Sequence, residues 1–440
     1  MGGIFKAYDI RGIYGDTLTE DIAFRIGRAY ATFLKPRTVA VGRDMRPHSM
    51  PLFEALARGL TQQGADVVDL GLCSTPMSYY ANTSLKADGS VMITASHNPG
   101  EWNGFKLCRE RAIPISGATG INEIEQLVAT GAFAPAAARP GRISRHEILP
   151  DYMAYIQKFA DIRRPLKVAV DYANGMGILE GKVFEVLPLQ VTPLFDTLDG
   201  TFPNHEANPL KHDTLEALQA LMRKERFDFG IAFDGDADRV GFLDERGEII
   251  PMDIVTTLIA QMILRKEKGP IFYDLRSSWA AREVIRESGG TPMMSRVGHA
   301  FIKAQMREAK ALFAGELSGH YYFRENGYAE SAALATLYIA DMVSQSAAPL
   351  SELVRPIRRY HASGEINSEV KDVDAVIRRL RAKYSTGRVI ELDGLSIEFD
   401  DWWFNVRPSN TEPLVRLNLE ARTAELMARR RDEVLGLIRA

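Results

Sequence analysis

Residues 38–71, TVAVGRDMRPHSMPLFEALARGLTQQGADVVDLG, contain the pattern that decides the fold class. The apolar run at 38–44 predicts a buried strand, residues 52–64 predict a helix that Gly64 closes, and residues 65–71 predict the next strand. A strand, a helix and a second strand in succession are typical of a largely parallel sheet covered by helices.

The same alternation of strand-like and helix-like stretches continues along most of the chain. It restarts at residues 166–177 and again at 269–290, which predicts three successive α/β units. An Ala-, Pro- and Gly-rich segment at 131–142 is predicted to be a linker. Near the C-terminus, residues 401–406 and 414–421 alternate with period two before a final helix. This last pattern indicates a small α+β domain with an antiparallel sheet.

The composition excludes several classes of function. Of 440 residues, 46% are hydrophobic and 25% charged, and the net charge of -3 gives no reason to expect nucleic acid or a membrane as partner. The two cysteines, Cys73 and Cys108, cannot form a disulfide framework or a cysteine metal cluster. No signal peptide, membrane-spanning run or exposed apolar stripe stands out. We therefore expect a cytoplasmic protein that is a monomer or weak dimer.

A polar loop follows the strand predicted at the start of GSVMITASHNPGEWNGFK, residues 89–106. The apolar run stops at Thr94, Ser96 and His97 follow, and Lys106 lies ten residues after the serine. We expect the loop to show the serine to solvent. Adjacent residues on an extended segment point to opposite sides, so His97 is not expected to be the general base of Ser96. The Gly-x-Ser-x-Gly pattern of a serine hydrolase is absent, and a plain polar turn remains an alternative.

Three aspartates, Asp234, Asp236 and Asp238, alternate along the loop after the predicted strand FGIAF. Close carboxylates repel one another unless a cation neutralises them, and Mg²⁺ with oxygen ligands is the simplest solution. A calcium loop of the EF-hand type is not expected, because Arg239 stands where that loop needs glycine. A solvated acidic turn is the alternative. A metal beside Arg239 suits phosphoryl transfer, and no nucleotide P-loop is present.

Two further polar loops lie downstream. In GELSGH, Glu316 and Ser318 suit a vicinal diol, with the carboxylate accepting two hydroxyl protons, although the glycines also suit a plain tight turn. RPSNTEP lies between the two period-two strands. Its side-chain donors are Arg407, Ser409, Asn410 and Thr411. They indicate either a phosphate-binding nest with a guanidinium or a polar hairpin loop.

In this order, the motifs TASHNP, DGDADR, GELSGH and RPSNTEP, preceded by KAYDIRG, resemble those of the α-D-phosphohexomutases. The resemblance covers the whole chain, and within the family it is strongest to the bacterial phosphomannomutase/phosphoglucomutase group. It implies four domains around a central cleft, three α/β domains with mixed, mostly parallel sheets and a smaller C-terminal α+β domain. The expected domains are 1–146 with the phosphoserine loop, 147–248 with the metal-binding loop, 249–360 with the sugar-binding loop and 361–440 with the phosphate-binding loop.

The resemblance also implies an activity and a role for each site residue. The enzyme would interconvert hexose 1-phosphate and hexose 6-phosphate, of mannose, glucose or both, through a phosphoserine and a hexose 1,6-bisphosphate that also serves as activator. Catalytic roles are implied for Ser96, His97, Lys106 (as general acid/base), Arg11, Arg239 and Tyr8. Contacts with the phosphosugar are implied for Arg276, His299, Glu316, Ser318, Arg407, Ser409, Asn410 and Thr411. The Mg²⁺ ligands would be Ser96, Asp234, Asp236 and Asp238.

Some positions depart from the family pattern, and other functions remain open. Arg276 stands where some relatives have lysine, and Glu412 adds a negative charge beside the phosphate loop, so either residue could tune substrate preference. Phosphoglucosamine mutases tend to have Gln and Gly where this chain has Leu317 and Ala237. A Mg-dependent sugar phosphatase and a non-catalytic sugar-phosphate binder are further alternatives. The sequence does not separate mannose from glucose.

Overall fold

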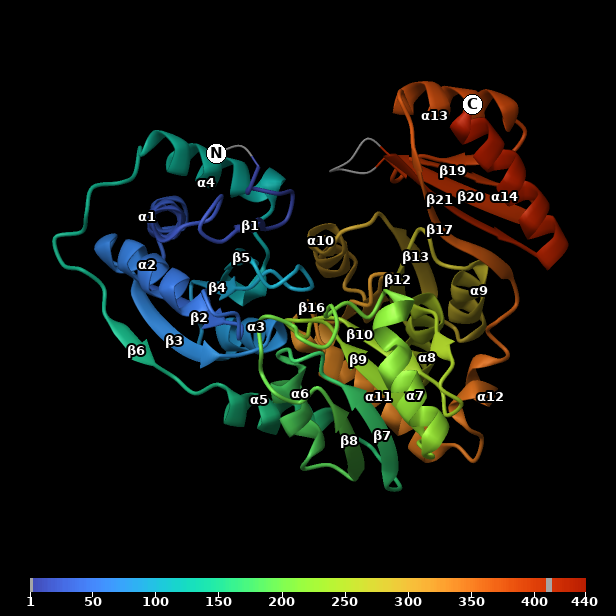
Figure 1. Ribbon diagram of the computed structural model, residues 1–440, viewed down its shortest axis with the longest axis horizontal. Coiled ribbons are helices and arrows are strands. Elements are labelled where there is room, and N and C mark those ends of the chain that lie inside the picture. Colours follow the sequence, from blue (N-terminus) through green and yellow to red (C-terminus); the bar gives the residue numbers. More distant parts are fainter. Residues whose placement is uncertain (1–2, 409–413) are drawn as a thin grey trace.

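The computed structural model describes residues 3–408 and 414–440, which form four units, each built on its own sheet (Figure 1). The first sheet contains, in spatial order, β1 (Ile10–Ile13), β5 (Trp102–Arg109), β4 (Gly89–Ile93), β2 (Thr38–Arg43), β3 (Asp66–Leu72) and β6 (Ile143–Arg145). Its helices are α1 (Glu20–Leu34), α2 (Ser49–Gln62), α3 (Thr75–Ser84) and α4 (Ile121–Thr130). Strands β2, β3, β4 and β6 are parallel, as residues 38–71 predict, whereas β1 and β5 are antiparallel to their neighbours.

The second and third sheets each combine two parallel and two antiparallel pairings. The second contains β11 (Ile249–Ile250), β10 (Val240–Leu243), β9 (Phe229–Phe233), β7 (Leu166–Asp171) and β8 (Leu189–Leu194), with helices α5 (Leu149–Ile156), α6 (Gly177–Phe184) and α7 (Glu216–Lys224). The third contains β13 (Thr291–Ser295), β12 (Pro270–Asp274), β14 (Phe313–Gly315), β15 (Tyr321–Phe323) and β16 (Ala329–Glu330), with helices α8 (Met252–Lys266), α9 (Trp279–Glu287), α10 (His299–Ala309), α11 (Ala332–Gln345) and α12 (Leu350–Val354). The predicted mixed α/β class is confirmed, but parallel pairing dominates only in the first sheet.

The fourth sheet is antiparallel, as the period-two pattern predicts. It contains β17 (His361–Glu369), β21 (Leu414–Ala421), β20 (Trp402–Pro408), β19 (Leu395–Glu398) and β18 (Arg388–Ile390), with helices α13 (Val373–Lys383) and α14 (Ala424–Arg439). Its buried core is separate and draws only on residues between Val376 and Ile438. The C-terminal unit therefore packs as its own body.

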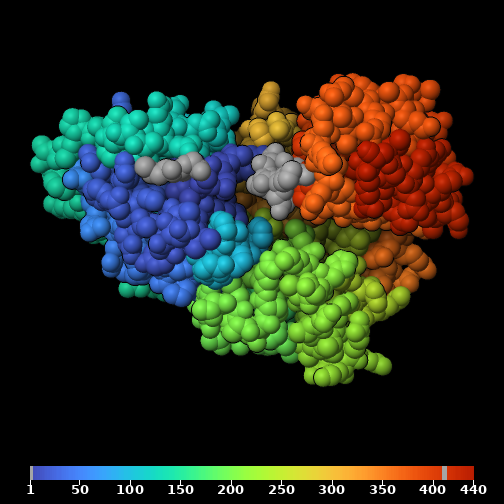
Figure 2. All heavy atoms as spheres, turned by 45° about the horizontal axis from the view of Figure 1, so that its top comes forward, coloured from blue at the N-terminus to red at the C-terminus, as the bar shows by residue number. Residues whose placement is uncertain are grey.

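The first three units, in contrast, share one apolar cluster. It includes Met77 of α3, Val170 of β7, Ile271 of β12 and Leu334 of α11. Figure 2 shows the first unit in blue and the last in orange and red on opposite sides of one face, with residues of the second unit in green between and below them. In the part of the chain that is described, none of the helices has both the length and the apolar character that crossing a membrane requires.

Three of the four sequence motifs occupy the connection between two antiparallel strands. TASHNP lies between β4 and β5, DGDADR between β9 and β10, and GELSGH between β14 and β15. The fourth motif, RPSNTEP, starts on β20, but residues 409–413, which include the predicted Ser409, Asn410 and Thr411, lie outside the described residues. The fold thus delivers each described motif on a hairpin.

Candidate active site

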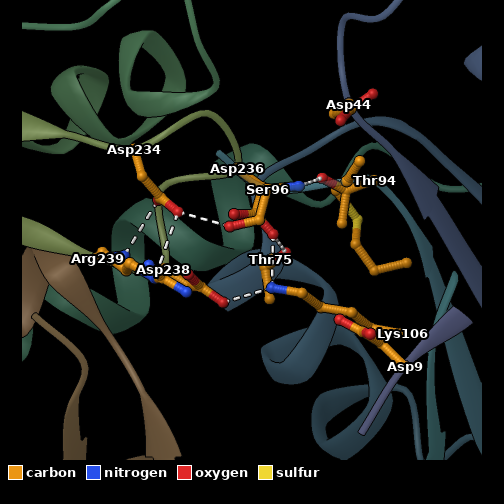
Figure 3. A network of polar contacts seen from close by, with 12 residues as sticks. Asp9, Asp44, Thr75, Thr94, Ser96, Lys106, Asp234, Asp236, Asp238 and Arg239 are labelled. Atoms are coloured by element: carbon orange, nitrogen blue, oxygen red, sulfur yellow. Dashed lines mark hydrogen bonds and ion pairs between the residues drawn. The ribbon is translucent and has the colours of Figure 1, made fainter. Parts of the chain in front are cut away.

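Ser96 follows β4 and contacts the aspartate loop (Figure 3). Its hydroxyl donates a hydrogen bond to Asp234 Oδ2 at 2.7 Å and lies 3.2 Å from His97 Nδ1. The prediction that the serine and histidine side chains diverge is wrong, because Ser96 has a φ of 53° and the chain turns there. Burial, together with the charges of Arg239 and Arg11, holds the pKa of His97 well below its usual range. A neutral imidazole therefore lies beside the hydroxyl.

The serine loop packs tightly against its surroundings. A Cβ atom added at Gly235 would lie 2.3 Å from the carbonyl oxygen of Ser96, so the aspartate loop needs glycine at that position. The fully buried Arg46 donates to the carbonyl oxygens of Ser96 and Asn98 at 3.0 and 2.6 Å, and Arg11 donates to Asn98 Oδ1 at 2.5 Å. Ser96 is only 1% exposed, so the expectation that it faces solvent is wrong. No sequence pattern identified Arg46 as a residue of the site.

The three aspartates occupy the turn between β9 and β10 and are buried (Figure 3). One oxygen from each lies within 4.8 Å of the others. Lys106 Nζ contacts Asp236 Oδ2 at 2.7 Å and Asp238 Oδ2 at 2.5 Å. Burial raises the pKa of Asp234, and its two neighbours add to this effect. Burial acts the same way on Asp238, but Lys106, His320 and Arg239 together outweigh it and hold that pKa well below its usual range.

The residues around the aspartates fit a divalent cation. The Oδ1 atoms of Asp236 and Asp238 are buried and accept no hydrogen bond from any described residue, although His320 Nε2 lies 3.3 Å from the second of them. Lys106 holds the opposite oxygens, and Thr75 Oγ1 also donates to Asp236 Oδ2 at 2.5 Å. Unpartnered carboxylate oxygens beside a serine hydroxyl form the all-oxygen ligand set that Mg²⁺ takes. Thr75 was not predicted, since nothing in its neighbourhood suggests a metal.

The sugar-loop candidates lie next to the aspartates. Glu316 is 2% exposed, and its carboxylate accepts hydrogen bonds from the backbone N–H of Gly298 at 2.9 Å and from the Tyr322 hydroxyl at 2.5 Å. Ser318 Oγ lies 2.8 Å from Nδ1 of His320. These contacts orient the carboxylate, which keeps acceptor capacity because each of its oxygens can accept two hydrogen bonds.

His320 connects the sugar loop to the aspartate loop. Its Nε2 atom lies 3.3 Å from Arg239 Nε as well as 3.3 Å from Asp238 Oδ1. Its ring centroid is 6.4 Å from that of His299, which is 5.3 Å from the ring of Tyr8. Tyr8 comes from the first unit and His299 from the third, so the two units meet beside this loop. His320 stands within a predicted motif but was not predicted as a site residue.

Arg276 and Arg407 form a second cluster at the border of the third and fourth units. Arg276 Nε donates to Asp274 Oδ1 at 2.9 Å, and its Nη1 atom lies 3.3 Å from Glu365 Oε2. Arg407 Nη2 lies 3.3 Å from the same Glu365 oxygen. The structure thus groups the candidates into a centre around Ser96 and a separate cationic cluster. Glu365 was not predicted, because an isolated glutamate in an exposed strand carries no signal.

Comparison with known proteins agrees with this arrangement. Family models described as phosphoglucomutase/phosphomannomutase match the chain in four successive segments. These are alpha/beta/alpha domain I at residues 2–135, domain II at 150–247, domain III at 251–360 and the C-terminal domain at 365–437. The chain is 41% identical to a phosphomannomutase of Salmonella montevideo, over 99% of this chain and 98% of that protein. It is 42% identical to the phosphohexose mutases of Xanthomonas campestris pv. campestris strain B100, over 99% of each.

A solved structure extends the agreement to three dimensions. The phosphoglucomutase/phosphomannomutase family protein of Burkholderia thailandensis superposes with a TM-score of 0.91 at 34% identity, over 99% of this chain and 96% of that one. The fold and the acidic, serine-bearing centre define a sugar-phosphate mutase, and the enzyme class inferred from the motifs is confirmed. The chain belongs to the phosphoglucomutase/phosphomannomutase family.

Proposed function

We propose that the protein interconverts hexose 1-phosphate and hexose 6-phosphate, with mannose, glucose or both as the sugar, through a phosphoserine at Ser96. The observation that carries the proposal is the position of the Ser96 hydroxyl, 2.7 Å from Asp234 Oδ2 within the buried carboxylate triad. A hydroxyl held against acidic oxygens, with guanidinium and ammonium groups nearby, suits the reversible carriage of a phosphoryl group.

Each half of the reaction moves one phosphoryl group. A sugar hydroxyl oxygen attacks the phosphorus on Ser96, the bond from phosphorus to Oγ breaks, and the hydroxyl proton ends on the serine oxygen. The product is a hexose 1,6-bisphosphate, which turns so that its other phosphate faces Ser96. The reverse transfer then rephosphorylates the serine and releases the isomer. The bisphosphate added from outside would prime the unphosphorylated enzyme.

The residues around Ser96 divide the work of this transfer. Neutral His97, 3.2 Å from the serine oxygen, is placed to hold or pass the proton at Oγ. Asp236 and Asp238 raise the pKa of Lys106 above its ordinary value despite its burial. Lys106 is therefore protonated and would donate its proton to an oxygen as a general acid. Arg239 and Arg11 spread the charge of the phosphoryl oxygens. Tyr8, whose ring centroid lies 5.3 Å from that of His299, would line the catalytic centre.

The triad would hold Mg²⁺ through Asp234, Asp236, Asp238 and the serine oxygen. When bound, Mg²⁺ would supply Lewis-acid stabilisation of phosphoryl charge. Lys106 and Thr75 hold the Oδ2 atoms on the far side, which keeps the two unpartnered Oδ1 atoms available. Lys106 and Thr75 thus orient the aspartates for metal binding without being ligands themselves.

The sugar and its second phosphate would be held away from the reacting centre. Glu316 and Ser318, with His299, would contact sugar hydroxyls, and Arg276 and Arg407 would bind the unreactive phosphate, together with the predicted Ser409, Asn410 and Thr411. Because the last unit has its own core, it can move as a lid over the cleft. The near-complete burial of Ser96 implies that water is excluded when the loops are closed, which protects a phosphoserine from hydrolysis.

Phosphorus NMR tests the proposal. Mannose 1-phosphate, glucose 1-phosphate and glucosamine 1-phosphate are each incubated with the protein, Mg²⁺ and a trace of glucose 1,6-bisphosphate. Conversion of the mannose or glucose substrate to the 6-phosphate, stopped by a chelator, is the expected result. Preference for glucosamine 1-phosphate would make the protein a phosphoglucosamine mutase. Growth of inorganic phosphate alone would make it a phosphatase and would refute the transfer mechanism.

A further inference from the structure

Glu365 lies at the centre of three arginines from two units. It is on β17 of the fourth unit, beside the register shift between Ala362 and Glu365. Its carboxylate lies 3.3 Å from Arg276 of the third unit, and 3.3 and 3.4 Å from Arg407 and Arg416 of its own unit. A single carboxylate therefore contacts guanidinium groups on both sides of the border between the third and fourth units.

This carboxylate satisfies the cluster only in part. Charge-assisted hydrogen bonds between arginine and carboxylate are usually about 2.7–2.9 Å long, so all three contacts are long. The Nε–H groups of Arg407 and Arg416 are buried and have no hydrogen-bond partner among the described residues. The Arg407 side chain is only 9% exposed, which makes its unpartnered donor costly. The cluster thus has room for an anion with more acceptor oxygens than Glu365 offers.

The charges support the same conclusion. Three guanidinium groups face Glu365, and Arg276 also pairs with Asp274, so the three arginines outnumber the two carboxylates that contact them. Burial, with repulsion from Arg276, lowers the pKa of Arg407 from its ordinary value. Burial tends to raise the pKa of Glu365, but the charges of Arg276, Arg407 and Arg416 together outweigh that effect and lower the pKa, so the carboxylate is ionised.

The cluster also borders open space. A cavity of about 550 Å³ is lined by Arg276 and Glu365, by Asn418 beside them and by Leu317 of the sugar loop. A charged group of a ligand held by the sugar loop can therefore reach the arginines without any movement of the backbone. The cavity has apolar lining as well, and its other two carboxylates, Asp253 and Glu420, accept hydrogen bonds from the backbone N–H groups of Ser278 and Trp279.

We infer that Glu365 is the internal counter-ion of a phosphate site formed by Arg276, Arg407 and Arg416, and that a phosphate dianion displaces it. The identity of the ligand as a sugar phosphate rests on the proposed function, whereas the displacement concerns any phosphate. Without ligand, Glu365 prevents the arginines from repelling one another and holds the two units together. It also sets the affinity, because every phosphate must compete with it. Glu365 thus determines the strength of phosphate binding, and Arg416 adds a ligand that the motif did not include.

Phosphate binding by the full-length protein tests this inference without any assay of activity. Inorganic phosphate is titrated by isothermal calorimetry into wild type, Glu365→Gln and Glu369→Gln, the last an exposed carboxylate on the same strand. Removing the competing charge is expected to lower the Kd for phosphate at least about tenfold in Glu365→Gln, since a full unit charge a few ångströms away is lost. Glu369→Gln is expected to match wild type, and Glu365→Asp, which keeps the charge, to stay within a few-fold of it.

Two results would overturn the inference. Unchanged affinity in Glu365→Gln would mean that the carboxylate does not face the phosphate, and weaker binding would mean that it positions the arginines instead of competing. Arg416→Gln covers the case in which Glu365→Gln does not fold, because Arg416 is 31% exposed and its replacement is mild. That variant should bind phosphate about tenfold more weakly, and an unchanged Kd would also refute the site. If phosphate binding behaves as expected but NMR shows no mutase activity in wild type, only the proposed function fails.

Discussion

Replacing Lys106 with methionine tests the electrostatics on which the active centre depends. The Lys106 ammonium is 9% exposed and contacts two aspartates that are 0 and 1% exposed. Lys106→Met keeps most of the side-chain volume but removes the cation. The three buried carboxyl groups of the triad would then lack the positive charge that Lys106 supplies. In the absence of metal, this charge cluster should destabilise the fold strongly.

The expected size of the effect follows from burial. Removing one partner of a buried ion pair costs about 3–5 kcal/mol, because it leaves an uncompensated charge in the interior. For a unit of this size, each kcal/mol lowers Tm by about 2–4 °C, so Lys106→Met should lower the first unfolding transition by about 6–20 °C. Mg²⁺ should recover more stability in the variant than in wild type, because the metal then supplies the missing positive charge.

Thermal unfolding in a chelator and in Mg²⁺ measures both effects. Lys182→Met is the matched control, since its ion pair with Glu185 has the same 2.7 Å length as the Lys106–Asp236 pair but is exposed to solvent. An exposed pair contributes about 0–1 kcal/mol, so the control should leave Tm nearly unchanged. Equal, small shifts in both variants would refute the argument that a buried ammonium balances the triad.

Two further predictions concern residues behind the site. Burial raises the pKa of Glu180, hydrogen-bonded by Ser74 and Tyr152, to about 7 from an unperturbed 4.5, so the folded state loses stability as pH rises through that range. Glu180→Gln should flatten this part of the pH profile of the unfolding free energy by up to about 3 kcal/mol, and an unchanged slope would contradict the assignment. Thr75→Val should weaken Mg²⁺ binding about 10–100-fold in calorimetry, because Asp236 loses the hydroxyl that orients it. Thr75→Ser should restore binding, and failure to do so would indicate a packing effect.

The sequence was sufficient for the site's chemistry because each motif is local. Alternating aspartates predict a metal wherever they lie in the chain, and the structure groups all three with Ser96 and Lys106. The α/β alternation likewise predicted helices on sheets, since periodicity reports burial directly. Periodicity alone did not reveal the antiparallel partner strands, because a connection such as residues 94–101 is longer than the loops of about two to five residues that identify a hairpin.

The remaining misses arise from contacts between distant segments. Arg46, Thr75 and Glu365 act on residues that lie tens to more than a hundred positions away, and no local pattern distinguishes them. The contact between Ser96 and His97 was predicted wrongly for a different reason. It depends on one backbone angle, a positive φ at a non-glycine residue, which sequence patterns do not reveal.

The central claim is that Ser96 carries the phosphoryl group, and intact-protein mass spectrometry tests it most directly. Wild type and Ser96→Ala are incubated with glucose 1,6-bisphosphate and Mg²⁺, freed of ligand and measured, and the modified peptide is then sequenced. Wild type should gain the mass of one phosphoryl group at Ser96, while the variant gains none and shows no turnover by phosphorus NMR. A phosphoryl group on another residue, or undiminished mutase activity in Ser96→Ala, would contradict the claim.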